Sequence, residues 1–200
     1  AQIQADYNAR GNNQGSSGNL SNSNTPAALS NGLVGYWNMD ESSWTVDCST
    51  SSVLDSSGLG NNGSACPNST GPAGGDGGKF AKSGSFDGSN DYINIPHSTS
   101  VSPSNQITVS AWIKTSSGSN RYIMTKHNDS FYLGIGVVNA NKFEFYINGV
   151  NSPAWVSSTT SVTDNAWHLV TATYDGTTQS VYVDGKLEAS IAQSGSIQTG

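Results

Sequence analysis

Charged residues are scarce in this sequence. Asp, Glu, Lys and Arg make up only 11% of the 200 residues, and the eight basic residues are scattered, so the formal net charge is −6. Because neutralising phosphate groups requires clustered Lys and Arg, this composition disfavours partners such as nucleic acid or an anionic membrane surface. No run of 18 apolar residues is present either, so no membrane insertion is expected within this chain.

Cysteine is also scarce, with Cys48 and Cys66 as the only two. Both lie in a turn-rich segment of Ser, Asp, Asn, Gly and Pro, where a disulfide would stabilise the fold by about 3 kcal/mol through the unfolded state. The alternative is a pair of free thiols in a cytosolic protein, but such thiols usually lie in apolar strands. We therefore predict a disulfide, and with it an extracellular or cell-surface location.

The sequence lacks the residue clusters of common hydrolases. Glycosidases flank the scissile bond with two carboxylates, but Glu41, Glu144 and Glu188 lie in three separate segments. The three histidines accompany neither a Gly-x-Ser-x-Gly turn nor a matched cysteine. We therefore predict that the chain is not an enzyme.

Ser, Thr, Asn and Gly dominate instead, a composition that suits short strands joined by many turns. Residues 1–31 hold few large apolar side chains and are predicted to form a flexible N-terminal arm or linker. From residue 32 to residue 200, short stretches of period-two alternation separated by turn dipeptides predict one antiparallel all-β domain. The expected strands are 32–38, 79–86, 91–95, 106–114, 121–126, 131–137, 142–148, 167–174, 178–184 and 187–192.

The alternation also predicts which side chains face the core. In the stretch 142–148, Phe143, Phe145 and Ile147 fall on one face, and Glu144, Tyr146 and Asn148 fall on the other. The polar and aromatic residues are therefore expected to point outward. By the same rule Trp112 and Tyr182 lie opposite the apolar residues of their own strands.

Five ordered stretches resemble the laminin-G-like and pentraxin-like jelly-roll families: GLVGYWNMDE (32–41), LDSSGLGNNGS (54–64), KFAKSGSFDGSNDYINIP (79–96), ITVSAWIKT (107–115) and NAWHLVTATYDGTTQSVYVDGKL (165–187). The resemblance covers about residues 32–200. It implies an antiparallel two-sheet β-sandwich, a jelly roll of the concanavalin A-like lectin type.

One departure from these families lies at the end of the sequence. Their domains usually finish with a further strand pair, whereas this sequence stops at 196–200, so we expect a sandwich that is missing its closing strands. Residues 1–31 or a neighbouring subunit could supply a strand to such an open edge, which would give self-assembly through the N-terminal arm. Truncation of a longer protein is the simpler explanation.

A saccharide site needs exposed aromatic faces beside amides or carboxylates. The outward residues that offer this mixture are Trp112, Tyr132, Glu144, Tyr146, Asn148 and Tyr182. Ordinary cross-strand tyrosine pairs, which stabilise a sheet without binding anything, are an equal alternative. Trp44 and Trp155 are expected in loops, where a tryptophan is a better candidate for a contact surface than in a core strand.

The resemblance also implies a structural calcium ion, because the family often carries one. Carboxylates and amides in turns are suitable hard oxygen ligands. The candidates are Asp40, Asp55, Asp87, Asn90 and Asp91. The alternative is that these side chains only cap turns.

These observations favour an extracellular, non-catalytic module that binds carbohydrate or mediates adhesion, with a glycan or a cell-surface protein as partner. The alternative is a structural subunit of a cell-surface filament or pilus-like appendage. A glycoside hydrolase ranks last, and is retained only because some glycosidases share the fold.

Overall fold

The computed structural model describes residues 32–126 and 130–199, so the predicted arm 1–31 lies outside the described residues. Antiparallel strands form almost all of the regular structure, with one short 3₁₀ helix at Thr99–Val101. None of the helices in the described part is long and apolar enough to cross a bilayer. The chain divides into two compact units, residues 1–101 and 102–200, and each is described by itself.

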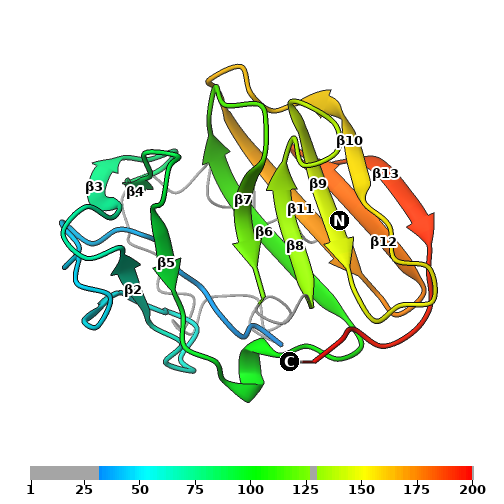
Figure 1. The fold of residues 1–200 in the computed structure, drawn as a ribbon, viewed down its shortest axis with the longest axis horizontal. Coiled ribbons are helices and arrows are strands. Elements are labelled where there is room, and N and C mark those ends of the chain that lie inside the picture. Colours follow the sequence, from blue (N-terminus) through cyan, green and yellow to red (C-terminus); the bar gives the residue numbers. More distant parts are fainter. Residues whose placement is uncertain (1–31, 127–129, 200) are drawn as a thin grey trace. The chain divides into compact units, whose positions relative to one another are not determined.

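The second unit is a sandwich of two four-stranded antiparallel sheets (Figure 1). One sheet has the order β13-β12-β11-β6 and consists of β6 (Ile107–Lys114), β11 (Trp167–Tyr174), β12 (Thr178–Val183) and β13 (Lys186–Ala192). The other has the order β10-β9-β8-β7 and consists of β7 (Arg121–Thr125), β8 (Phe131–Ile135), β9 (Lys142–Ile147) and β10 (Val156–Ser161). These two sheets confirm the predicted fold class.

The core of this unit lies between its two sheets. Phe143, Phe145 and Ile147 of β9 are fully buried and pack with Val170 of β11 and Val181 of β12. Every second residue of these strands therefore faces inward, as the alternation predicts. The intervening residues of β8 and β9 are left on the outer face of their sheet.

The segment after β13 packs against the same sandwich. Ile197 is buried, and its amide donates to the carbonyl of Ser104 at 2.7 Å. The amide of Gln198 donates to the carbonyl of Asn148 at 2.9 Å. Residues 193–199 are thereby fixed beside the end of β9.

The first unit contains a three-stranded sheet of order β1-β2-β5 and a two-stranded sheet of β3 and β4. The strands are β1 (Ser51–Val53), β2 (Gly63–Cys66), β3 (Ala73–Gly77), β4 (Lys82–Ser85) and β5 (Tyr92–Asn94). Trp44, Val53 and Ala65 form its small core. The expectation that Trp44 offers a contact surface is therefore wrong, because its ring is buried.

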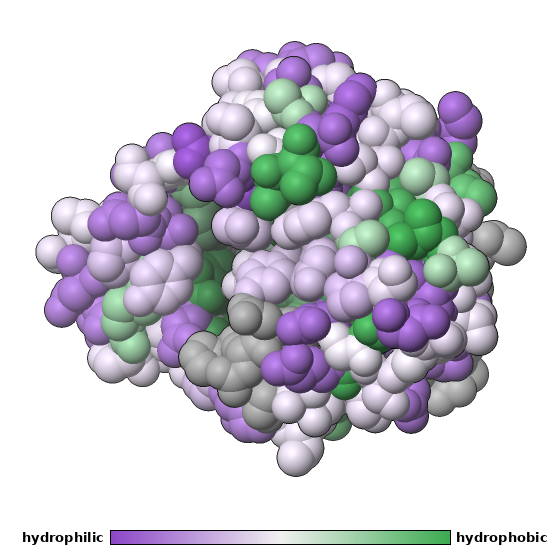
Figure 2. All heavy atoms as spheres, turned by 45° about the vertical axis from the view of Figure 1, so that its right-hand side comes forward, coloured by the Kyte–Doolittle hydropathy of each residue, from purple (hydrophilic) through white to green (hydrophobic). Residues whose placement is uncertain are grey.

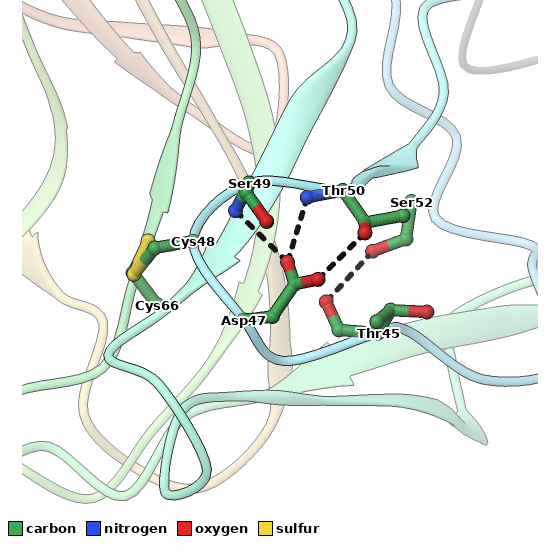
Figure 3. Close-up of a disulfide and its surroundings, with 7 residues drawn as sticks. All are labelled: Thr45, Asp47, Cys48, Ser49, Thr50, Ser52 and Cys66. Atoms are coloured by element: carbon green, nitrogen blue, oxygen red, sulfur yellow. Dashed lines mark hydrogen bonds between the residues drawn. A yellow bond between two sulfur atoms is a disulfide. The ribbon is translucent and has the colours of Figure 1, made fainter.

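The predicted disulfide between Cys48 and Cys66 is present, with the two Cα atoms 4.8 Å apart. It joins the end of β2 to a tight loop that Asp47 organises (Figure 3). The Asp47 carboxylate accepts hydrogen bonds from the amides of Ser49 and Thr50 at 2.8 and 2.6 Å and from the Thr50 hydroxyl at 2.6 Å. These bonds, first of all the one from the Thr50 hydroxyl, hold the pKa of Asp47 well below its ordinary value.

Strand prediction was wrong mainly in the first unit. The expected strand 32–38 is absent from the described chain, apart from an isolated bridge between Trp37 and Asp55. In contrast, β1, β2, β3 and β10 are formed although they were not predicted. Sequences such as GSAC and VSSTTS carry little apolar alternation, so these strands depend on pairing with neighbours that are distant in sequence.

Candidate functional site

Four aromatic side chains gather on the outer face of the sheet β10-β9-β8-β7. Tyr122 comes from β7, Tyr132 from β8 and Tyr146 from β9, while Trp155 directly precedes β10. Tyr132 and Tyr146 are direct cross-strand partners, and the pairing of Val156 with Phe145 brings Trp155 beside Tyr146. The alternation that buries Phe145 thus turns Tyr146 to the opposite face.

The rings form four contacting pairs, and Tyr132 contacts each of the other three rings. Its ring centroid lies 5.8 Å from Tyr122, 6.1 Å from Tyr146 and 6.3 Å from Trp155. The closest pair is Tyr146 and Trp155 at 5.3 Å, with an angle of 37° between the ring planes. All four contacting pairs are tilted, so the rings do not form a flat stack.

These four rings and Asn148 line a groove of about 360 Å³. The Asn148 amide group donates to the Gln198 side-chain oxygen at 2.9 Å, and its own oxygen accepts from the Gly149 amide at 2.9 Å. An amide NH₂ has two hydrogens and its oxygen two lone pairs, so Asn148 is held in place with one donor and one acceptor position left over. Among the described residues, the lining carries no Asp, Glu, Lys, Arg or His.

Elsewhere the exposed hydrophobic side chains do not form a broad surface on the face drawn in Figure 2. They form small, separate patches among polar residues. Isolated apolar side chains of this kind are normal on soluble domains. The aromatic groove differs from these patches because its aromatic side chains contact one another.

Three of the six predicted ligand residues lie in this groove: Tyr132, Tyr146 and Asn148. Trp112 and Tyr182 do not line it, because they belong to β6 and β12 of the other sheet. Two lining residues were missing from the predicted set, Tyr122 and Trp155. Trp155 was anticipated only as a loop tryptophan.

Glu144 shares the outer face with Tyr146, but the prediction that it points to solvent is wrong. Its side chain is fully buried, because the connection between β8 and β9 folds onto its carboxylate. The carboxylate accepts hydrogen bonds from the amides of Val137, Val138 and Asn139 at 2.6, 3.0 and 2.8 Å, and from the Ser157 hydroxyl at 2.9 Å. Glu144 therefore organises a loop and does not reach the groove.

The carboxylates of the other two glutamates also accept hydrogen bonds from the protein. Glu41 accepts from the Trp44 indole at 3.1 Å and from the Leu54 amide at 3.0 Å. Glu188 of β13 accepts from the Thr159 hydroxyl and from the Thr159 and Thr160 amides of β10. These bonds, the Thr159 hydroxyl first, lower the pKa of Glu188 to about 2 against a smaller opposing effect of burial.

Two predicted calcium ligands, Asp40 and Asp55, make backbone hydrogen bonds. Asp40 accepts from the Lys82 amide at 3.1 Å. Asp55 accepts from the amides of Tyr36, Ser57 and Asn61 at 2.8 to 2.9 Å. Burial raises the pKa of Asp55, but these hydrogen bonds together outweigh burial and bring its pKa below the ordinary value.

The remaining three candidates lie in the loop before β5. The Asp91 carboxylate accepts from the Asp87 amide at 2.8 Å, Asp87 accepts from the Ser89 amide at 2.7 Å, and Asn90 is exposed. Within residues 32–126 and 130–199, no three His, Cys, Asp or Glu side chains gather as a metal site would require. The contacts match the turn-capping alternative, and calcium binding stays a prediction.

Comparison with known proteins identifies the fold family. A sequence model of the laminin-G-like branch of the concanavalin A-like lectin/glucanases superfamily matches residues 87–200, which is more than half of the chain. The chain belongs to this superfamily. The concanavalin A-like resemblance of the sequence is thereby confirmed.

Solved structures agree with the concanavalin A-like fold. The binding domain of Paraclostridial mosquitocidal protein 1 matches with a TM-score of 0.61 and 17% identity, covering 84% of this chain and 42% of that one. Domain 4 of AbnA, a GH43 extracellular arabinanase from Geobacillus stearothermophilus solved with arabinotriose, matches with a TM-score of 0.60 and 17% identity, covering 84% and 79%. At these identities the similarity shows the fold alone.

A mouse laminin alpha1 chain, domains LG4-5, also matches, with a TM-score of 0.39 and 18% identity over 50% of this chain and 29% of that one. The chain thus spans less than half of the laminin and mosquitocidal protein chains. No curated protein matches the sequence. A concanavalin A-like domain with a disulfide is typical of extracellular proteins.

Proposed function

We propose that this chain is an extracellular, non-catalytic carbohydrate-binding module and that its ligand occupies the groove of Tyr122, Tyr132, Tyr146, Asn148 and Trp155. The observation that carries the proposal is the cluster of four contacting rings around a groove whose one amide is held in place. Cross-strand pairing accounts for the contacts of Tyr146 with Tyr132 and with Trp155. It does not account for the contact between Trp155 and Tyr132, because β10 and β8 are not neighbouring strands.

The chemistry of the groove suits a sugar. The C–H faces of a sugar ring are apolar and pack against aromatic rings, while its hydroxyl groups need a few fixed donors and acceptors. The rings supply the first requirement, and the remaining donor and acceptor positions of Asn148 supply the second. A volume of about 360 Å³ is at the small end of ligand pockets, so a short saccharide segment fits it.

Charge favours an uncharged saccharide. The described lining has no basic side chain to pair with a sulfate or a carboxylate, and the whole chain carries a net charge of −6. An anionic glycan would therefore meet repulsion without a compensating ion pair. The arabinanase domain of the same fold was solved with arabinotriose, an uncharged oligosaccharide, which supports testing this class first.

The lack of catalysis is part of the proposal. Cleavage of a glycosidic bond requires two carboxyl groups facing the substrate. Glu41, Glu144 and Glu188 instead accept hydrogen bonds from the protein itself at three different places. Each carboxylate thereby has a structural role.

The proposal can be tested with immobilised, uncharged oligosaccharides and isothermal titration calorimetry. Tyr146→Ala and Trp155→Ala should each weaken binding by about tenfold or more, since each removes a ring from the centre of the contact. Tyr122→Ala has a matched control in Tyr92→Ala, because both side chains are 51% exposed and Tyr92 lies on β5 of the first unit. Equal losses for Tyr122→Ala and Tyr92→Ala, or no binding to any uncharged oligosaccharide, would contradict the proposal.

The alternative of a filament subunit depends on residues 1–31, which lie outside the described residues. Assembly through this arm stays a prediction. Electron microscopy of the purified protein tests it directly.

A further inference from the structure

A polar side chain lies on the inward face of the sandwich, on the side opposite the aromatic groove. Gln179, at the start of β12, is fully buried and lies on the same inward face as Val181 and Val183. Burying an amide costs free energy unless its groups are hydrogen-bonded. A glutamine at this position is therefore expected to make hydrogen bonds that valine or leucine could not make.

The Gln179 side chain reaches across to the sheet that carries the groove. Its nitrogen donates to the main-chain carbonyl of Phe145 at 2.7 Å and makes a longer contact of 3.5 Å with the carbonyl of Ala154. The first is a strong hydrogen bond and the second a weak one. One amide group therefore touches the main chain of β9 and of the segment that enters β10.

These two carbonyls belong to the residues that immediately precede Tyr146 and Trp155. Each carbonyl carbon is bonded to the amide nitrogen of the aromatic residue that follows it. The rings of these two aromatic residues form the closest pair of the groove, at 5.3 Å. Holding both carbonyls by one side chain therefore restrains the separation of the two rings. The oxygen of the Gln179 side chain has no hydrogen-bond partner in the described chain, so the two carbonyl contacts are the polar interactions that this side chain makes.

We propose that Gln179 is a positioning residue of the aromatic groove: from the opposite sheet, it fixes the spacing between Tyr146 and Trp155 that the ligand requires. The inference rests on the proposed function for the nature of the ligand. The tether, by which we mean the contacts of Gln179 with the two carbonyls, does not depend on that function. Without the amide donor, the main chain at Ala154 would lose its contact with Gln179, although Val150 and Asn151 still anchor the earlier part of the connection 148–155. Trp155 would then sample several positions, and ordering it again would weaken binding.

Two variants at this position separate the donor from the shape of the side chain. Gln179→Leu removes the donor and keeps the size, and should weaken binding to the oligosaccharide by about tenfold. Gln179→Glu keeps the shape and, because burial raises the pKa of a carboxyl group, is protonated near pH 5 and keeps one O–H donor. Its affinity at pH 5 should therefore stay within about threefold of that of the original protein.

A matched control is available in Gln193, which is also a buried glutamine of the second unit. Its side-chain nitrogen and oxygen have no hydrogen-bond partners in the described chain. Gln193→Leu should therefore leave affinity and its pH dependence unchanged. If Gln179→Leu binds as tightly as Gln193→Leu, the positioning role is refuted.

A readout without ligand distinguishes failure of the tether from failure of the proposed function. The fluorescence of Trp155, obtained by subtracting the spectrum of a Trp155→Phe background, should shift to longer wavelength in Gln179→Leu, and near pH 5 it should stay unchanged in Gln179→Glu. A Trp155 spectrum that is identical in Gln179→Leu, Gln193→Leu and the original protein refutes the tether, whether or not any saccharide binds. If Gln179→Leu fails to fold, the same measurements on Gln179→Met, which also lacks a donor but adapts its shape to the site, decide the question.

Discussion

Replacing Glu144 by alanine tests the reassignment of this residue from a ligand contact to an internal anchor. The carboxylate accepts four hydrogen bonds, from three consecutive amides of the β8–β9 connection and from Ser157. A hydrogen bond to a charged group contributes about 1.5–3 kcal/mol. Because this connection borders solvent at Val138 and Asn139, water can replace part of the lost contacts. We expect a net loss of about 3–4 kcal/mol in the free energy of unfolding.

Urea unfolding measures this loss, and hydrogen exchange locates it at the amides of 137–139. Glu144→Gln keeps one acceptor oxygen and should lose about half as much, while Ser157→Ala removes one donor and should lose about 1 kcal/mol. A loss below about 1 kcal/mol in Glu144→Ala with the three amides still protected would refute the anchor. Unchanged stability with abolished saccharide binding would return Glu144 to the ligand site.

Three further predictions concern other structural contacts. Replacing Cys48 and Cys66 by serine should lower the free energy of unfolding by about 3 kcal/mol, measured by urea unfolding against the original protein with its disulfide intact, because the disulfide closes a loop with a sequence separation of 18. The pKa of Glu188 is lowered from 4.5 to about 2, so its stabilising contribution is present above pH 4.5 and is lost as pH falls toward 2; thermal melts of Glu188→Gln should lack this dependence. Burial lowers the pKa of His168, but its hydrogen bonds to Asp184 at 2.9 Å and Asp164 at 3.1 Å outweigh burial and raise it above 6.5. The contribution of protonated His168 to stability is therefore present below pH 6.5 and is lost as pH rises through the raised pKa. Thermal melts of His168→Gln should lack this dependence on pH.

The sandwich of the second unit could be predicted because its strands obey simple alternation. The alternating apolar residues of β9 predict its inward face without information on the neighbouring strands; they are Phe143, Phe145 and Ile147. Strands β1, β2 and β3 of the first unit could not be predicted in this way, since GSAC of β2 becomes a strand through its pairing with β1 and β5. That pairing depends on contacts that no local pattern records.

The candidate site was predictable in part for the same reason. Alternation places Tyr132 and Tyr146 on the outer face, but it does not state which strands are neighbours, so Trp112 and Tyr182 of the other sheet were grouped with them. It also assumes that an outward side chain is exposed. Glu144 breaks this assumption because a loop turns its amides toward the carboxylate.

The alternation of β9 has a consequence for how such a domain can diversify. Phe145 and Tyr146 are adjacent in sequence, yet one side chain fills the interior and the other lines the groove. Substitutions at the outward positions can therefore change what is recognised while the interior that determines folding stays the same. A library of variants could therefore test new ligand specificities while the packing of the core stays unchanged. It would vary only the five lining residues Tyr122, Tyr132, Tyr146, Asn148 and Trp155, and it would leave Glu144 and Gln179 unchanged.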